Sequence, residues 1–309
     1  MNLQANIQTR IYGLDRFFFE LIDIYKKNKL PNKILLTGEK GCGKSTLAYH
    51  FINYVLSQDE DYSYNETKLE IQENNRSFKL ISNKSSPNFE LVDIDKEKKN
   101  IDINQIRNLI SNLNKSGFNT KPRFVLLNNI EYLNKNAINA LLKMIEEPNT
   151  GVYFILINNS KNLLATLKSR CLEFRISLTN KESILITNKI LGQNILDTIN
   201  VDLLNFYQTP GNILNIFLFA AENQINLKDL SIENFLRKLI DQKYYKKDIS
   251  TKRMIFEYIE MFFLKKINFS NIKLFSLYDY FLDYYRNTQK YNLDEESFFI
   301  EFKSKLLNG

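Results

Sequence analysis

Apolar residues in the first part of the chain are concentrated in short runs, and amphipathic segments separate these runs. The runs predict buried strands at 33–37, 89–95, 123–127, 152–157 and 172–176. Between them, segments 45–56 and 102–113 place apolar residues on one face of a helix. Strands that alternate with helices in this way predict an α/β fold with a doubly wound parallel sheet. The polar stretch 57–88 reads as an excursion on the surface.

Helical spacing replaces the strand pattern after position 176. One stripe keeps the i, i+3, i+4, i+7, i+8 rule: Ile232, Phe235, Leu236, Leu239 and Ile240. A Thr-Pro-Gly break at 209–211 separates two helical stretches, and Asp294 is the expected N-cap of a last helix. We therefore predict three domains, with a sheet domain at 1–176, a small helical domain at 177–225 and an all-α domain at 226–309.

Charge and cysteine content narrow the class of protein only a little. The net charge of +7 permits contact with nucleic acid, but the lysines are scattered and a solvated surface is the favoured interpretation. No apolar run reaches the length of a membrane span, and the N-terminus lacks the order of a signal peptide, so we expect a cytoplasmic protein. Two cysteines, Cys42 and Cys171, give neither a disulfide framework nor a four-cysteine zinc site.

Residues 38–45 read GEKGCGKS, which is a complete phosphate-binding loop. Its glycines let the backbone turn its amides toward phosphate oxygens: Gly38, Gly41 and Gly43. Lys44 supplies positive charge to the β- and γ-phosphates, and Ser45 offers a hydroxyl to Mg²⁺. A predicted strand precedes the loop and a predicted helix follows it, as this chemistry requires. The sequence predicts phosphate binding, and a relic loop that no longer binds is the alternative.

The strand that should hold the magnesium ion is followed by amides. It reads RFVLLNNIE and places Asn128 and Asn129 where acids would be expected. A neutral carbonyl at position 128 leaves the cation less neutralised than a carboxylate would. An amide at position 129 binds the attacking water but does not accept its proton. We therefore expect ATP hydrolysis by this chain to be weak or absent, unless Glu131 compensates.

Three further segments carry a family resemblance. They read LNKNAINALLKMIEEP at 133–148, VYFILINN at 152–159 and TLKSRC at 166–171. Taken in order with the phosphate-binding loop, they resemble the clamp-loader subunits of bacterial DNA polymerase III, which are members of the AAA+ superfamily. The likeness extends from about position 30 to position 171. The last two motifs are much more specific than the loop.

Within that family the chain is similar to the zinc-free delta-prime type. Gamma/tau motor subunits normally carry a zinc-binding cysteine cluster after the first helix, and the stretch 57–88 contains neither Cys nor His. Motor subunits also need acids at the positions of Asn128 and Asn129. The alternative is a gamma/tau-like motor or another AAA+ ATPase, which would require the alignment to be shifted at these positions.

The resemblance implies an architecture, cofactors and partners. The three predicted parts become an AAA+ nucleotide-binding domain, a helical lid and a C-terminal collar domain. ATP with Mg²⁺ and no zinc is the implied cofactor set, and Thr46, Asn128 and Asn158 join the loop as nucleotide contacts. Asn158 is equally well a turn residue. The implied partners are gamma/tau and delta subunits, and through the assembly the sliding clamp and primed DNA, with no membrane.

The resemblance also assigns a role to Arg170. In the family, the arginine of the S-R-C motif reaches across a subunit interface to the ATP of the neighbour, so Arg170 is the expected catalytic residue, acting in trans. Pairing of Arg170 with a local carboxylate is the alternative. In the lid turn QTPGNIL, Gly211 fits the family pattern, whereas Asn212 stands where a sensing arginine often sits.

Overall fold

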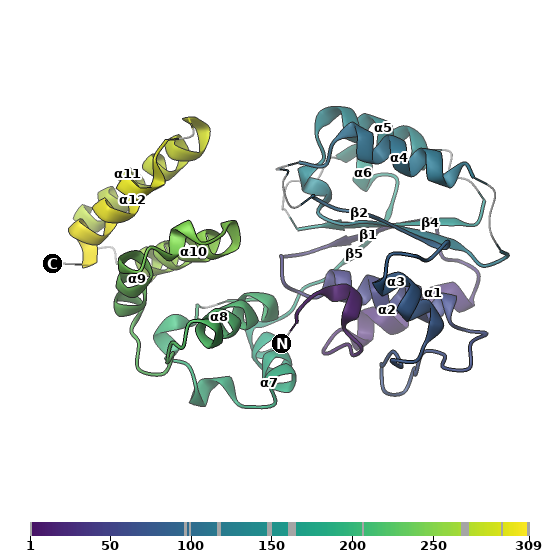
Figure 1. Cartoon of the computed structure of the whole chain (residues 1–309), viewed down its shortest axis with the longest axis horizontal. Coiled ribbons are helices and arrows are strands. Elements are labelled where there is room, and N and C mark those ends of the chain that lie inside the picture. Colours follow the sequence, from purple (N-terminus) through teal and green to yellow (C-terminus); the bar gives the residue numbers. More distant parts are fainter. Residues whose placement is uncertain are drawn as a thin grey trace. The chain divides into compact units, whose positions relative to one another are not determined.

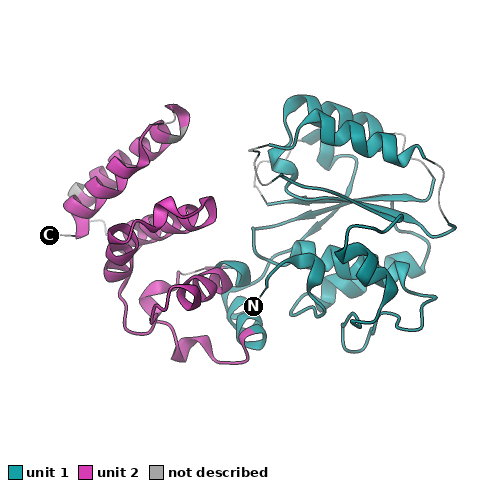
Figure 2. Ribbon diagram, viewed as in Figure 1, with its two compact units in different colours: residues 1–190, 209–212 teal, residues 191–208, 213–309 magenta. Residues whose placement is uncertain are grey.

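The computed structural model describes most of the chain in two compact units. The described residues are 2–95, 98, 100–115, 119–146, 150–159, 165–205, 207–266, 272–291 and 293–307, without the side chains of 272, 273 and 289. One unit comprises 1–190 with 209–212, and the other comprises 191–208 with 213–309 (Figure 2). The division into three domains stays a prediction. Glu147 and Pro148 of the ALLK-MIEEP motif lie outside the described residues.

The first unit is built on a parallel sheet with the strand order β2-β3-β4-β1-β5. Its strands are β1 (Lys33–Thr37), β2 (Phe89–Val92), β3 (Arg123–Leu127), β4 (Val152–Asn158) and β5 (Leu172–Arg175). All five predicted strands are present, and the predicted doubly wound α/β fold is confirmed. The main difference is that β2 ends at Val92, so Asp93 follows the strand instead of lying inside it.

Helices cover both faces of the sheet (Figure 1). On one face lie α1 (Asp15–Lys26), α2 (Lys44–Leu56) and α3 (Arg76–Ser82), and on the other lie α4 (Ile103–Leu113), α5 (Lys135–Glu146) and α6 (Ala165–Lys168). The helix α7 (Asn180–Leu191) follows the last strand. Short 3₁₀ turns occur at Ala5–Ile7, Ile130–Tyr132, Ile195–Asp197, Val201–Leu203 and Tyr244–Lys246.

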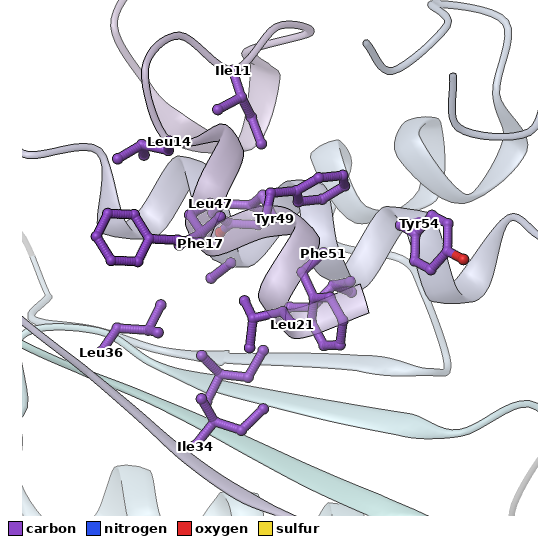
Figure 3. Packing of buried hydrophobic residues seen from close by; sticks show 14 of the residues in the cluster. Ile11, Leu14, Phe17, Leu21, Ile34, Leu36, Leu47, Tyr49, Phe51 and Tyr54 are labelled. Atoms are coloured by element: carbon purple, nitrogen blue, oxygen red, sulfur yellow. The ribbon is translucent and has the colours of Figure 1, made fainter. Parts of the chain in front are cut away.

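Two cores result because successive side chains of a strand point to opposite faces of the sheet. On β1, Ile34 and Leu36 pack with α1 and α2, while Leu35 packs in the core beneath α4 and α5. Figure 3 shows Ile34 and Leu36 facing Leu21 and Phe51 of the helical layer. Burial on both faces explains why the central strands β1, β3 and β4 are continuous apolar runs in the sequence.

The stretch 57–88 is more than the polar surface excursion that its composition suggests. It contains α3, and four of its apolar side chains are buried in the core with α1 and α2: Tyr64, Leu69, Ile71 and Ile81. His50 lies fully buried on α2 and shares hydrogen bonds with the Tyr64 hydroxyl (2.9 Å) and the Gln8 carbonyl oxygen (3.2 Å). Burial lowers the pKa of His50 to about 3, so it is a neutral packing residue.

The second unit is helical. Its helices are α9 (Ile232–Asp241), α10 (Ile249–Lys266), α11 (Ile272–Tyr291) and α12 (Glu295–Phe302), with a π-helical turn at Lys303–Leu307, and α8 (Pro210–Glu222) begins in the first unit. The predicted stripe on α9 is buried, and Asp294 caps α12 by accepting hydrogen bonds from two backbone amides. Phe281 and Phe302 pack edge to face, with ring centroids 5.4 Å apart. Within the described residues, no helix is both long and apolar enough to cross a membrane.

Two neighbouring phenylalanines of α1 test the packing of the first core. Phe18 is fully buried, 5.0 Å from the ring of Tyr64, whereas Phe19 is 46% exposed. We expect Phe18→Ala to lower the free energy of unfolding by about 3–5 kcal/mol through cavity formation. Phe19→Ala is the control and should change it by less than about 0.5 kcal/mol. Native-state hydrogen exchange of the α2 amides measures both, and equal effects would contradict the described packing.

Candidate functional site

The phosphate-binding loop joins the carboxyl end of β1 to the first turn of α2. Gly38 and Gly41 have φ angles of 145° and 90°, which side chains rarely allow. A Cβ atom on Gly38 would also lie 2.1 Å from the carbonyl oxygen of Ile176. The helix α2 begins at Lys44, within the last two residues of the loop, so its unpaired first-turn amides face the same space. This backbone is shaped to surround an anion.

Lys44 lies inside this loop. Its side chain is buried, and its Nζ donates hydrogen bonds to the carbonyl oxygens of Gly38 (2.8 Å) and Glu39 (2.6 Å). Burial lowers the pKa of Lys44 to about 8, and electrostatic interactions with Cys42, Glu131 and Glu39 oppose that shift only in part. The ammonium group therefore lies in a poorly solvated place, where a phosphate oxygen would be a strong partner.

Ser45 connects the loop to the end of the third strand. Its Oγ donates to Oδ1 of Asn128 at 3.2 Å, and Nδ2 of Asn128 donates to a carboxylate oxygen of Asp93 at 2.8 Å. Nδ2 of Asn129 donates to the other oxygen of Asp93 at 2.6 Å. One carboxylate from the end of β2 thus binds both amides that occupy the positions expected to be acidic.

A second set of contacts continues this network across the edge of the sheet. Oδ1 of Asn129 accepts a hydrogen bond from Nδ2 of Asn159 at 2.8 Å. The backbone and side-chain nitrogens of Asn159 each donate to Glu131, at 3.1 Å. Glu131, the residue that could compensate for the missing acids, is therefore engaged with Asn159. Its carboxylate also lies close enough to Lys44 to oppose, in part, the lowering of the Lys44 pKa by burial.

The structure brings the predicted loop residues and Asn128 together, and it adds two residues that sequence reasoning missed. Asp93 escaped notice because the predicted strand extended to position 95, which placed it within the strand. Asn159 follows β4, and its place after a buried strand was the available signal. Asn158 is the last residue of β4 and is buried, and Thr46 lies half-buried on α2. Roles for Asn158 and Thr46 in nucleotide binding stay predictions.

The donor set fits a magnesium nucleotide. The loop amides and Lys44 suit phosphate oxygens, and Mg²⁺ favours oxygen ligands such as the Ser45 hydroxyl and water held by nearby amide or carboxylate groups. When bound, the ion would draw charge from the β- and γ-phosphates. Within the described ranges, no group of three or more His, Cys, Asp or Glu side chains is arranged to hold a metal. Absence of zinc stays a prediction.

The lid turn packs directly on the phosphate-binding loop. The Thr209 hydroxyl donates to the carbonyl oxygen of Lys40 at 2.9 Å, and the backbone amide of Gly211 donates to the carbonyl oxygen of Gly41 at 3.0 Å. A Cβ atom on Gly211 would lie 2.6 Å from Cα of Gly41, so glycine is required for this approach. These bonds use loop carbonyls and leave the loop amides for an anion.

Arg170 occupies the turn after α6. Its Nε and Nη2 donate to Oε1 of Glu146 at 3.1 and 2.8 Å, and its Nη1 donates to the carbonyl oxygen of Thr166 at 2.9 Å. The local carboxylate pairing considered from the sequence is therefore present in this chain. The ion pair is partly open to solvent, with 36% of the Arg170 side chain and 48% of the Glu146 side chain exposed.

Sheet topology separates Arg170 from the phosphate-binding loop. Arg170 precedes β5, whereas the loop follows β1, and β1 and β5 are parallel neighbours. The two sites therefore lie at opposite edges of the sheet, separated by about the length of a four-residue strand, roughly 13 Å. The geometry keeps the Arg170 turn away from the phosphates of its own chain.

Comparisons with known proteins agree with the motifs. Residues 14–180 match the family described as DNA polymerase III, delta subunit. A DNA polymerase III subunit delta' of Buchnera aphidicola subsp. Baizongia pistaciae is 26% identical over 308 residues, which cover 89% of this chain and 90% of that protein. A DNA polymerase III subunit gamma of Buchnera aphidicola subsp. Schizaphis graminum is 25% identical over 244 residues, covering 74% of this chain and 64% of that one.

Among solved structures, the chain is similar to a DNA polymerase III gamma subunit-related protein of Thermotoga maritima. It has 16% sequence identity and a TM-score of 0.49, and the match covers 93% of this chain and 98% of that one.

The lowered pKa of Lys44 predicts a pH dependence of phosphate binding. Only the charged ammonium attracts phosphate, so affinity for a nonhydrolysable ATP analogue should fall as pH rises through about 8. Well above that pKa the fall approaches about tenfold per pH unit. Lys44→Arg keeps its charge throughout and should bind with a flat profile, whatever its absolute affinity. Calorimetry between about pH 7 and 9.5 measures this, and constant wild-type affinity would contradict it.

Proposed function

The chain belongs to the DNA polymerase III delta subunit family, among the delta-prime clamp-loader subunits of DNA replication, and from this premise we propose that it presents Arg170 to the ATP of a neighbouring subunit. We further propose that its own loop, Gly38–Ser45, holds ATP with Mg²⁺ and hydrolyses it slowly or not at all. The parallel sheet with strand order β2-β3-β4-β1-β5 supports the second part, since ligands of such sheets bind at the carboxyl ends of the strands.

One observation carries the first part: Arg170 and the phosphate-binding loop lie at opposite edges of the same sheet. A guanidinium at the amino end of β5 does not serve the nucleotide at the carboxyl end of β1, and its partial exposure leaves it accessible to a second subunit. There its fixed positive charge would stabilise the γ-phosphate during transfer, a role worth about 10³ to 10⁵ in rate in phosphotransferases. Its planar fork of donors distinguishes it from lysine.

The Glu146 ion pair is compatible with this role. Exposed ion pairs contribute only about 0–1 kcal/mol, because water competes for both charges. Exchange of one carboxylate oxygen for a phosphate oxygen is therefore inexpensive for Arg170. The hydrogen bond to Thr166 runs to a backbone oxygen of the same turn, so it can stay in place while the guanidinium changes its anionic partner.

The network around Asp93 supports slow hydrolysis in cis. Both amides at the expected acidic positions donate to Asp93, and Glu131 accepts from Asn159. No carboxylate in this network replaces the acid that would take a proton from an attacking water at position 129. Binding does not depend on that acid, since Lys44 and the loop amides remain in place.

Relatives named gamma, gamma/tau and delta' support a complex of such subunits. We propose that this chain assembles with gamma/tau and delta subunits, and that the assembly places a sliding clamp on primed DNA. We also propose the cytoplasm as its location, because that is where such a replication assembly would meet its DNA. Co-purification with candidate gamma/tau and delta chains tests the partnership directly.

Replacement of Arg170 tests the action in trans. In the reconstituted complex, Arg170→Ala should lower ATP hydrolysis at the neighbouring site by about 10³ or more, because the positive charge facing the γ-phosphate is lost. Nucleotide affinity of this chain should stay unchanged. Lys168→Ala is the matched control, since Lys168 ends α6 two residues before Arg170 but pairs with Glu173 at 2.9 Å. Single-turnover hydrolysis measures the effect, and an unchanged rate in Arg170→Ala would reject the role.

The second candidate function is that of a gamma/tau-like motor. The similarity to a DNA polymerase III subunit gamma favours it. The purified chain distinguishes the two. The proposal expects little ATP turnover by the wild type, alone or with DNA. Turnover that DNA stimulates and Lys44→Ala abolishes would establish a motor and show that Asn128 and Asn129 permit catalysis.

A further inference from the structure

We infer that Asp93 is the anionic residue of the magnesium site, acting through Asn128 from the neighbouring strand. The inference rests on the proposed nucleotide site and adds a residue to it. The third strand lacks the expected acid, yet a carboxylate lies one hydrogen bond beyond its replacement. The negative charge that the ion needs lies at the end of β2, in Asp93, instead of at the end of β3.

Backbone pairing puts Asp93 in this place. The backbone amide of Asn128 donates to the carbonyl oxygen of Val92 at 2.8 Å, which extends the β2–β3 pairing to the last residue of β2. Asp93 and Asn128 each follow their strand by one residue, so their side chains meet at the carboxyl edge of the sheet. This is the edge that carries the phosphate-binding loop.

The carboxylate determines which way the Asn128 amide points. An ionised carboxylate only accepts hydrogen bonds, so it takes the NH₂ end of the amide at 2.8 Å. Oδ1 of Asn128 is consequently directed to the Ser45 hydroxyl, at 3.2 Å. Without Asp93, the two ends of the amide would be free to exchange. Asp93 thereby holds an oxygen ligand toward the hydroxyl that the loop offers to Mg²⁺.

The same carboxylate acts on Asn129 through its other oxygen, at 2.6 Å, and so directs Oδ1 of Asn129 to Asn159. Asp93 is only partly buried and its neighbours are neutral amides, so its negative charge is not cancelled by a cation in this network. At a separation of one intervening side chain, such a charge attracts a divalent cation. Asp93 is therefore a positioning residue and a source of charge.

The test compares nucleotide binding with and without the metal. The full-length protein is titrated with a nonhydrolysable ATP analogue, once in Mg²⁺ and once in EDTA. The affinity in Mg²⁺ divided by the affinity in EDTA gives a ratio that measures the contribution of the metal. Asp93→Asn should lower this ratio about 10- to 100-fold, as expected for loss of an outer-shell partner of a metal, and should leave the affinity in EDTA unchanged. Mn²⁺ binding in the presence of the analogue, followed by electron paramagnetic resonance, should weaken in parallel.

Two further variants separate this role from a purely structural one. Asp95→Asn removes an exposed acid two residues away, one that pairs with Lys98 at 3.4 Å, and should keep the wild-type ratio. The double variant Asp93→Asn with Asn128→Asp exchanges the carboxylate and the amide between the two strand ends. It should restore the magnesium dependence, because the charge returns to the metal side of the pair.

Three results would overturn the role of Asp93, and a fourth would reject the nucleotide site itself. A wild-type ratio in Asp93→Asn overturns the inference, as does an equal loss of affinity in Mg²⁺ and EDTA, which would indicate a structural role. Failure of the folded double variant to recover magnesium dependence also overturns it, with folding checked by circular dichroism. If the wild-type protein binds no analogue in either condition, the nucleotide site itself is rejected, and this inference falls with it.

Discussion

The parallel direction of all five strands is the constraint on which the rest of this structure depends. It sends every residue that follows a strand to one edge of the sheet and every residue that precedes a strand to the other. The phosphate-binding loop, Asp93, Asn128 and Asn159 follow four different strands and meet at one edge. Arg170 precedes β5 and lies at the opposite edge. The phosphate-binding loop and Arg170 are thus separated by the length of the strands.

The edge of the sheet that carries the phosphate-binding loop has the backbone expected of such a site, but two of its side chains differ from those expected. The loop keeps its glycines, the buried lysine that begins the next helix and the serine that follows it, while amides stand at the acidic positions. The amides do not leave the site uncharged, because Asp93 binds both of them. On the proposals above, this network supplies charge for a cation, while a neutral amide stands where the base for an attacking water is expected. Packing of Gly211 against Gly41 ties the lid turn to the same loop.

Sequence patterns predicted the elements well where burial is continuous. The central strands β1, β3 and β4 are buried on both faces, and the α9 stripe is buried along one side, so both leave an unambiguous spacing of apolar residues. The stretch 57–88 shows the opposite case. Its apolar residues are few among polar ones and sustain neither a period of two nor one of 3.6 over a long segment, so Tyr64 and Ile71 carried little local signal of their place in the core.

The sequence by itself determined the α/β fold, the phosphate-binding loop and the family, because short motifs and periodic burial are local properties of a chain. Tertiary structure decided what the motifs do together. That Asp93 supplies a carboxylate to Asn128 depends on β2 ending at Val92 and on its pairing with β3, contacts between segments 35 residues apart. That Arg170 binds Glu146, far from its own chain's loop, depends on the sheet order. Hydrogen bonds of this reach follow from the packed backbone, and residue spacing along the chain does not encode them.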